Sequence, residues 1–460
     1  MSLDQYRGQC LAKLVWAIER LGIEADPARL SRVAELIVQT MTGPWRYFHT
    51  PDHLFEVGGQ DDAIEGLAAL FHDIVYVQVD RGIHFNLACF LAPFIEQDED
   101  RLRIRAAAEL PTGAPEVALI FDLFAVAPGQ VLSPFGGQNE LLSAIVAVQV
   151  MRPWLPPWVL AQIATCIEAT IPFRRPSEQG ATPSERLCER LRAANARFGL
   201  ELGEAEILET VMRSVRLSNR DVGGFGDTSA RFLDNTWSLL PETNPHFENP
   251  NSYTAREYRT SLQKTAAFLE SLDPQVIFRR FHGEPDEETY GQLVGRARHN
   301  LAVGRLYLGS KLVAMAFLEA LSHRLGPDVP LTLMLGQLPT SGELAARLAD
   351  RLPESRRPYT PGSVVEAEVF NLLDKGRTRE SEYDLRNSPM SVLLVRAIGF
   401  DGILRELTRA HAFFAGTMAP EDFLAGGPEG VITALVKGMV DLFERRKQAI
   451  TSPGRPPQGS

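Results

Sequence analysis

The sequence predicts an all-α protein. Apolar residues recur every three or four positions along most of the chain, whereas period-two runs bounded by hairpin turns are scarce. With 460 residues the chain has room for two or three domains, and its 45% hydrophobic residues are ordinary for a globular protein. No repeat of fixed period and no glycine pattern of a nucleotide-binding loop is visible. We therefore expect packed helices throughout.

The first helices are identified from their apolar faces and their capping residues. One apolar face spans positions 11–21, and Asp26-Pro27 opens a second helix because proline lacks the N–H that a first turn leaves unpaired. In the same way, Thr50 can cap a third helix that begins at Pro51. This helix holds His53 in its first turn.

The next helices end at polar residues. A fourth helix, over roughly 60–73, carries an apolar face and ends at His72 and Asp73. A later helix begins near Val159 and is stopped by Pro172, because proline cannot continue a helix. Both ends are places where side chains from a buried helix can reach a cleft.

Asp221 lies near the end of a further helix. The apolar run from Ile207 to Val215 has helical spacing, so the carboxylate can reach the same cleft as the earlier helix ends. The alternative is a helix-ending turn residue, since Gly223 and Gly224 follow directly. Both interpretations remain open at this point.

A second helical region begins near Asn244-Pro245. We expect a first domain over 1–243, a second over 244–450, and a flexible tail over 451–460, which is rich in Pro, Gly and Ser. The second domain should contain a long helix and several amphipathic ones, at 300–321, 364–373, 391–398 and 430–445; the run 331–335 is a strand or a buried helix. Its histidines stand alone and are assigned structural roles: His246, His282, His299, His323 and His411.

Charge and composition restrict the partners and the location. A net charge of −11 argues against nucleic acid, whose binding requires basic patches. The four cysteines have no C-x-x-C spacing, and the N-terminus has no signal-peptide pattern. The longest apolar run, 141–151, is too short for a bilayer, and Arg305 and Lys311 interrupt the long helix. We expect a cytoplasmic protein that does not contact a membrane.

Potential metal ligands cluster in one part of the sequence. Three of the nine histidines, His49, His53 and His72, lie with Asp73 between positions 49 and 73. Imidazole and carboxylate together suit Fe, Mn, Zn and Co, and a bridging carboxylate also admits Mg. A single histidine beside an apolar helix is more often a hydrogen-bonded core residue. The four residues together are better explained by a metal site.

The same residues carry a resemblance to a known family. The stretch Arg46–Leu54 resembles the R-x-Y-H-N-x-x-H-I element of the HD-domain metal-dependent phosphohydrolases, and Phe71–Tyr76 resembles their F-H-D-x-x-Y element. The match is closer to the bacterial branch, although the catalytic domains of cyclic-nucleotide phosphodiesterases share a version of both elements. The resemblance implies an HD-type helical bundle.

The resemblance also implies roles for individual residues. His53, His72 and Asp73 would be metal ligands, and His49 would donate a proton to the leaving oxygen. A distal aspartate should complete the set, and Asp221 is the candidate. The specific resemblance covers about Arg46 to Trp237, less than half of the chain.

The sequence departs from the family pattern at several positions. Phe48 stands where the family has tyrosine, and Thr50 where it has asparagine. The phosphodiesterase pattern A-D-L-S-N would place the aspartate at Arg216. Tyr76 occupies the position of a further histidine that supports the second metal in the eukaryotic phosphodiesterases. These departures leave open both the distal ligand and a second ion.

The implied function is metal-dependent hydrolysis of a nucleotide-like or other small phosphate ester, with one or two divalent ions of Mn, Mg, Zn or Fe. Four further residues are candidates for substrate binding: His84, Glu168, Arg174 and Arg175. Arginine guanidinium groups suit phosphate, but the segment that contains Arg174 can equally be a solvated helix end. The other candidate functions are a di-iron oxygenase, for which only His84 offers an extra ligand, and a regulatory module that binds metal or nucleotide without turnover. Homo-oligomerisation is left open.

Overall fold

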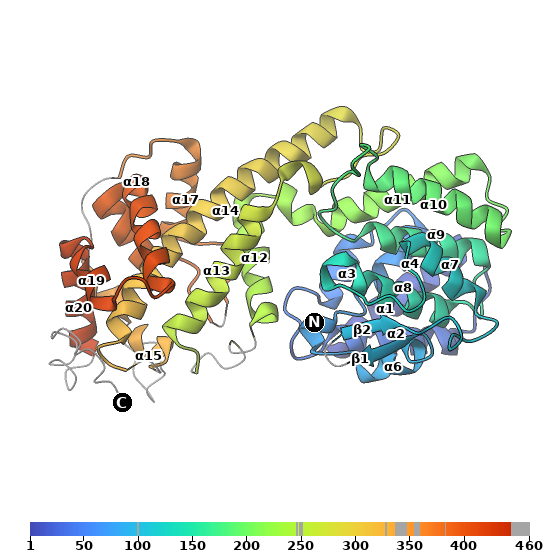
Figure 1. Cartoon of the computed structure of the whole chain (residues 1–460), viewed down its shortest axis with the longest axis horizontal. Coiled ribbons are helices and arrows are strands. Elements are labelled where there is room, and N and C mark those ends of the chain that lie inside the picture. The colour runs from blue at the N-terminus through green and yellow to red at the C-terminus, as the bar shows by residue number, and fades with distance from the viewer. Residues whose placement is uncertain are drawn as a thin grey trace. The chain divides into compact units, whose positions relative to one another are not determined.

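The computed structural model describes residues 1–98, 101–244, 247, 252–326, 329–335, 347–353, 359–381 and 383–442. Helices dominate these residues (Figure 1), and the all-α prediction is confirmed. One short antiparallel hairpin pairs β1 (Ile95–Asp98) with β2 (Arg101–Ile104). The chain forms two compact units, residues 1–226 with 273–297 and residues 227–272 with 298–460. Each is described by itself.

The first unit is a bundle of helices around a buried central one. Helix α9 (Pro157–Ala169) is buried at every position from Val159 onward, which explains why its sequence is apolar on all sides. It packs against helices α4, α7, α8 and α11. The helices of this unit are α1 (Leu3–Arg20), α2 (Pro27–Met41), α3 (Pro51–Val57), α4 (Ala63–Phe71), α5 (Val77–Asp80), α6 (Phe85–Leu91), α7 (Pro115–Phe124), α8 (Gln138–Met151), α9, α10 (Pro183–Phe198) and α11 (Glu204–Asp221), followed by the 3₁₀ turn η2 (Gly223–Gly226).

Capping residues set the helix starts that position the site. Helix α4 begins later than the predicted 60, because Asp62 accepts hydrogen bonds from the backbone N–H groups of Ile64 and Glu65. Helix α3 begins at Pro51 as expected. Thr50 occupies its N-cap position, but its side chain makes no capping hydrogen bond.

The second unit is also helical. Its helices are α12 (Ser229–Thr243), α13 (Ala255–Ser271), the main part of α14 (Glu287–Ser322), α15 (Leu331–Leu335), α16 (Leu348–Arg351), α17 (Val364–Lys375), α18 (Pro389–Phe414), α19 (Pro420–Ala425) and α20 (Glu429–Leu442). The run 331–335 is therefore a helix and not a strand. Gly399, at φ 67°, interrupts α18. Trp237, Tyr253, Tyr258 and Tyr307 are fully buried in this unit.

The division between the units differs from the predicted boundary at 243. Helix α12 packs against α13 and belongs to the second unit, whereas residues 273–297 return to the first. This return is fixed by Asn219 of α11, whose amide donates to the carbonyl oxygen of Arg279 at 2.9 Å and accepts from its N–H at 2.8 Å. The predicted tail 451–460 and His246 lie outside the described residues.

Helix α14 is the one helix among the described residues that is long and apolar enough to cross a membrane. In its most apolar stretch, 83% is buried inside the fold, as in the core helix of a globular protein. Its charged residues have partners within the second unit, since Arg305 donates to the carbonyl oxygen of Leu269 and Lys311 pairs with Asp384. The fold thus accounts for the apolar character of α14 without a membrane.

Candidate metal centre

Four side chains predicted to hold a metal converge in the first unit. His53 lies in the first turn of α3, and His72 caps the C-terminal end of α4. Asp73 follows directly, and Asp221 is the last residue of α11. One potential ligand atom from each residue lies within 4.8 Å of each of the others. Helix ends that are distant in the sequence therefore form one His/Asp group that could hold a metal ion.

The imidazole nitrogens of this group face its carboxylates. His53 Nε2 is 3.1 Å from Asp221 Oδ1 and 3.5 Å from Asp73 Oδ2. His72 Nε2 is 3.0 Å from Asp73 Oδ2 and 3.3 Å from Asp221 Oδ1. His72 Nδ1 is 2.8 Å from the carbonyl oxygen of Ala69. Because a carbonyl can only accept, Nδ1 carries a proton, and Nε2 is left as the nitrogen that can bind a metal.

Three arginines on one face of α11 hold this helix against α4. Arg213 Nε donates to Asp62 Oδ2 at 2.6 Å, and Asp62 is the residue that caps α4. Arg216 Nε donates to Glu65 Oε1 at 2.7 Å, and Arg220 Nη2 donates to Glu65 Oε2 at 2.5 Å. Glu65 is buried, so these bonds have little competition from water. They fix the angle at which α11 delivers the distal aspartate.

Arg216 occupies the position where the phosphodiesterase pattern places the aspartate, but it faces other carboxylates. Besides Glu65, it bonds Glu209 at 2.9 Å and Glu284 at 3.2 Å. The group that could hold a metal ion contains Asp221 instead, five residues further along the helix.

Arg46 supports the backbone beside the metal ligands. Its side chain is fully buried and donates from Nε and Nη2 to the two carboxylate oxygens of Asp80, at 2.9 and 2.6 Å. It also donates to the carbonyl oxygens of Asp73 at 2.7 Å and Ile74 at 3.2 Å. Ser143 Oγ of α8 accepts a backbone N–H of the same segment. The first residue of the motif thus positions a ligand without coordinating.

Mutual attraction determines the protonation of the metal-free group. Burial by itself lowers the pKa of His53, but the hydrogen bonds and charges of Asp221 and Asp73 outweigh burial and raise this pKa to about 9. The pKa of His72 is raised for the same reason, despite full burial. Conversely, burial raises the carboxyl pKa values, yet His72 and its neighbours hold those of Asp73 and Asp221 below their usual range. The metal-free group is therefore a set of buried imidazolium–carboxylate pairs.

His49 lies beside the ligand set rather than within it. Its Nε2 is 4.0 Å from Asp73 Oδ2, and 9% of the residue is exposed. The ring packs edge-on against Tyr76, with 4.4 Å between the ring centroids, and against Phe48 at 5.0 Å. These contacts hold the imidazole at the edge of the metal centre.

The helix end predicted to bind substrate is an ion-pair cluster. Glu168 is 1% exposed and receives two bonds from Arg174, Nη1 to Oε1 at 2.5 Å and Nη2 to Oε2 at 2.9 Å. Arg190 of α10 also donates to Glu168. The solvated-end alternative is wrong for Glu168, because its carboxylate is buried. Arg175 is exposed, and its carbonyl oxygen accepts from Arg186.

Arg279 adds a third guanidinium to this cluster, from the segment that returns to the first unit. It is 8% exposed and donates from Nη2 to the carbonyl oxygen of Ile171 at 2.5 Å. Its buried Nη1 has no hydrogen-bond partner among the described residues. Burial lowers its pKa to about 9 and Arg174 adds repulsion, while Glu168 and Asp221 act in the opposite direction. Arg174 and Arg190 pair with Glu168, and Arg279 interacts electrostatically with Glu168 and with Asp221, so guanidinium groups outnumber carboxylates in this cluster.

Glu140 is a further acid that the sequence reasoning missed. The pKa of its carboxyl is raised to about 7, chiefly by burial and also by the nearby charges of Asp73 and Asp221. A backbone hydrogen bond acts in the opposite direction and lowers this pKa. It lies in the first turn of α8, directly after a glycine-rich turn. The sequence did offer a signal for Glu140, because this acidic residue lies in the first turn of an otherwise apolar helix. No local sequence pattern pointed to Arg190 or Arg279.

His84 has a capping role in the structure. It is the N-cap of α6, and its Nδ1 accepts from the backbone N–H of Asn86 at 3.3 Å. It is not a member of the four-residue ligand group. Substrate contacts of His84, Glu168, Arg174 and Arg175 stay predictions.

The donor set fits a divalent cation. Two imidazole nitrogens and two carboxylate oxygens lie within 4.8 Å of one another, and together they carry a compensating charge of −2 when the imidazoles are neutral. The chain matches no family model, and neither a curated protein nor a solved structure is significantly similar to it. Only the residues of the site itself therefore bear on the function.

Proposed function

We propose that the chain is a metal-dependent phosphohydrolase or phosphodiesterase that acts on a small, nucleotide-like phosphate ester. The observation that carries this proposal is the convergence of two imidazoles and two carboxylates in one group, together with Arg279, whose guanidinium interacts electrostatically with Asp221 of that group and with Arg174. The imidazoles and carboxylates suit Mn, Fe, Zn or, with a bridging carboxylate, Mg. The guanidiniums suit phosphate oxygens.

His53, His72, Asp73 and Asp221 would hold the ion. When bound, a divalent cation activates water at neutral pH and polarises a phosphoryl oxygen. His72 donates from Nδ1 to the carbonyl oxygen of Ala69, and Arg46 donates to the backbone carbonyl oxygen of Asp73. The arginines of α11 hold the helix that carries Asp221 against α4. His72, Asp73 and Asp221 would therefore need little rearrangement to bind the ion.

The remaining residues would bind the ester and move protons. The unpaired Nη1 of Arg279, with Arg174 beside it, would bind phosphate oxygens and orient the ester. His49, held against Tyr76, would protonate the leaving oxygen, a step typically worth ~10²–10⁴-fold. Glu140 would accept the proton that the attacking water loses. This places one proton donor and one acceptor around a single site.

The proposal is tested by metal analysis and hydrolysis assays on the Asp221→Asn variant. The substitution removes one anionic ligand, so bound metal and the hydrolysis of phosphate esters should both fall at least tenfold. Asp227→Asn is the matched control, because Asp227 lies outside the ligand group and bonds the backbone N–H of Thr228. The Asp227→Asn variant should keep both its bound metal and its hydrolysis of phosphate esters.

Two results would contradict the proposal. Unchanged metal content in Asp221→Asn would show that the ligand set is misassigned. Two irons per chain, with oxygen consumption and no ester hydrolysis, would replace the hydrolase by an oxygenase.

A further inference from the structure

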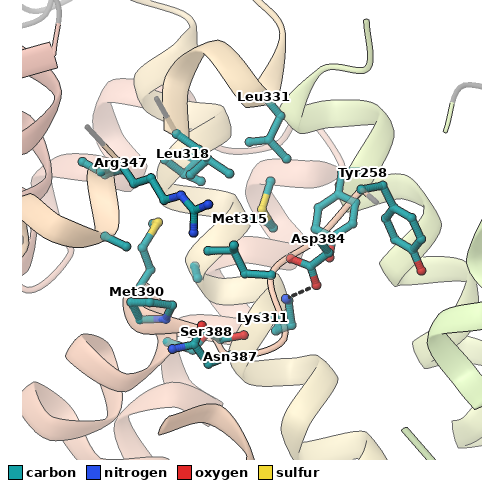
Figure 2. Close-up of a pocket in the computed structure, with 18 residues that line it drawn as sticks. Tyr258, Lys311, Met315, Leu318, Leu331, Arg347, Asp384, Asn387, Ser388 and Met390 are labelled. Carbon is teal, nitrogen blue, oxygen red and sulfur yellow. Dashed lines mark hydrogen bonds and ion pairs between the residues drawn. The ribbon is translucent and has the colours of Figure 1, made fainter. Parts of the chain in front are cut away.

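The second unit contains a pocket that the proposed hydrolysis does not use (Figure 2). Its walls are apolar, made chiefly by Met315 and Leu318 of α14, Leu331 of α15 and Met390 of α18. The space within it that can hold the centre of a water molecule is about 70 Å³. This is room for roughly half a dozen waters, which suits a small organic group rather than a nucleotide.

The base of this pocket is charged but internally balanced. Lys311 is 6% exposed, and its Nζ lies 2.5 Å from Asp384 Oδ2, as the dashed line in Figure 2 marks. The same carboxylate accepts from Trp237 Nε1 at 2.7 Å, and Arg377 lies 3.7 Å from it. Buried charges persist when they are paired and hydrogen-bonded. The Lys311–Asp384 pair therefore contributes no net charge to the pocket.

Two buried hydroxyl groups lie at the pocket with incomplete hydrogen bonding among the described residues. Tyr258 is 2% exposed and Ser388 is 7% exposed, and neither Tyr258 Oη nor Ser388 Oγ has a partner of normal hydrogen-bond geometry, although Asp384 interacts with Tyr258 and Tyr307 with Ser388. Ser388 is the N-cap of α18, but its side chain does not cap the helix. Because a buried polar group without a partner is unfavourable, these hydroxyls are places where a ligand atom would be stabilised.

Arg347 supplies the unbalanced charge. Its side chain extends into the pocket from the side opposite Lys311 and Asp384 (Figure 2). Asp350 accepts from the backbone N–H of Arg347 and not from its guanidinium, and no ion pair to Arg347 occurs among the described residues. Among the described residues, the charged ones that line the pocket are Lys311, Arg347 and Asp384, and their net charge is +1.

We propose that this pocket binds a small apolar carboxylic acid. The carboxylate would pair with the guanidinium of Arg347, which matches it in geometry and in charge, and would accept a hydrogen bond from Ser388 Oγ. The apolar body would lie between Met315, Leu318 and Leu331. A phosphate group is disfavoured because one unbalanced guanidinium cannot neutralise a dianion, and the surrounding walls are apolar.

The proposal is tested by calorimetric titration of the full-length protein with octanoate, octanol and inorganic phosphate. Octanoate should bind once per chain. Octanol has the tail without the charge, and phosphate has the charge without the tail, so each should bind at least tenfold more weakly. If octanol bound as tightly as octanoate, the assignment of a carboxylate would be overturned. If phosphate bound as tightly as octanoate, the assignment of an apolar ligand would be overturned.

Two variants locate the bound acid. Arg347→Gln changes an exposed residue and should weaken octanoate binding at least tenfold, and Ser388→Ala should weaken it severalfold. Arg351→Gln is the matched control, because Arg351 is an exposed arginine of the same helix that does not line the pocket, and it should bind octanoate normally. No octanoate binding by the unaltered protein, or equal binding by Arg347→Gln and Arg351→Gln, would overturn the proposal.

Discussion

At the scale of single residues, neighbouring groups determine which nitrogen of a site histidine carries a proton and how its ring is oriented. The Nδ1 proton of His72 is fixed by the carbonyl oxygen of Ala69, and the ring of His49 is fixed by Tyr76. Under the proposed function, these contacts separate a metal ligand from a proton donor, although both side chains are imidazoles. Variants at the two histidines should therefore fail in different ways.

His49→Ala should keep the metal and lose most of kcat on an ester with a poor leaving group. His49 lies outside the ligand set but near Asp73, where a protonated imidazole can reach a departing oxygen. A nitrophenyl ester needs little protonation of its leaving group, so its hydrolysis should suffer much less. Steady-state kinetics on both substrates, with metal analysis, test this. Equal losses on both would show that His49 is no general acid, and loss of metal would make it a ligand.

Metal affinity should rise with pH. In the metal-free protein the pKa of His53 is about 9, so below pH 9 a proton must leave before Nε2 can bind a cation. The apparent affinity should increase at least about tenfold per pH unit below this value. Competition titrations with a fluorescent chelator at pH 6, 7 and 8 measure it. An affinity independent of pH over this range would contradict the assigned protonation.

The stability of the metal-free protein should change in the opposite direction. The folded pKa of His53 exceeds the ordinary value of 6.5, so its pairing stabilises the fold fully below pH 6.5 and is lost as pH rises through 9. Thermal unfolding in a chelator should show this decline. In the His53→Gln variant, the glutamine cannot be protonated in this range, so the decline in thermal stability with rising pH should be smaller.

At the scale of elements, the sequence predicted which helices exist better than how they are joined. The apolar faces of α1, α2 and α11 and the caps Asp26 and Asp62 are local signals, because a helix is specified by residues within a few turns of one another. The candidate ligands His53, His72 and Asp73 were found because they cluster in the sequence, and Asp221 because the family resemblance required a distal aspartate near a helix end. Arg190 and Arg279 were missed because an arginine far along the chain has no local signature of the cleft it reaches.

Glu65→Ala should loosen α11 from α4. The substitution leaves Arg216 and Arg220 without their shared partner. Breaking a buried ion pair costs about 3–5 kcal/mol, and the partial exposure of both arginines reduces this to on the order of 2–3 kcal/mol. Urea unfolding measures the change, and bound metal should fall because Asp221 is no longer held in place. Glu204→Ala, which removes an exposed ion pair with Arg192, is the control and should alter neither.

At the scale of the whole molecule, the first unit is built from two separate parts of the chain. Residues 273–297 return to it after a segment that belongs to the second unit. A sequence boundary drawn by composition, such as 243, cannot detect a return of this kind, because pairing between distant segments leaves no local pattern. The discontinuity matters for the proposed function because Arg279 lies in the returning segment.

Asn219→Ala should test the return of this segment. It removes both hydrogen bonds to the backbone of Arg279, so KM for the phosphate ester should rise severalfold while the bound metal is retained. Asn195→Ala is a matched control, because Asn195 makes the same two kinds of bond to the backbone of Leu202 in the loop between α10 and α11. This control should lower stability to a similar extent and leave KM unchanged. A similar KM in both variants would remove Arg279 from the substrate site.

The late position of Arg279 also affects the order in which the site is completed during synthesis. A ribosome moving from the N-terminus supplies the last metal ligand at residue 221, whereas Arg279 follows only after residues 227–272 have been added. Under the proposed function, the nascent chain therefore contains all four residues that would hold the metal before it contains the full set of guanidiniums that would bind the ester.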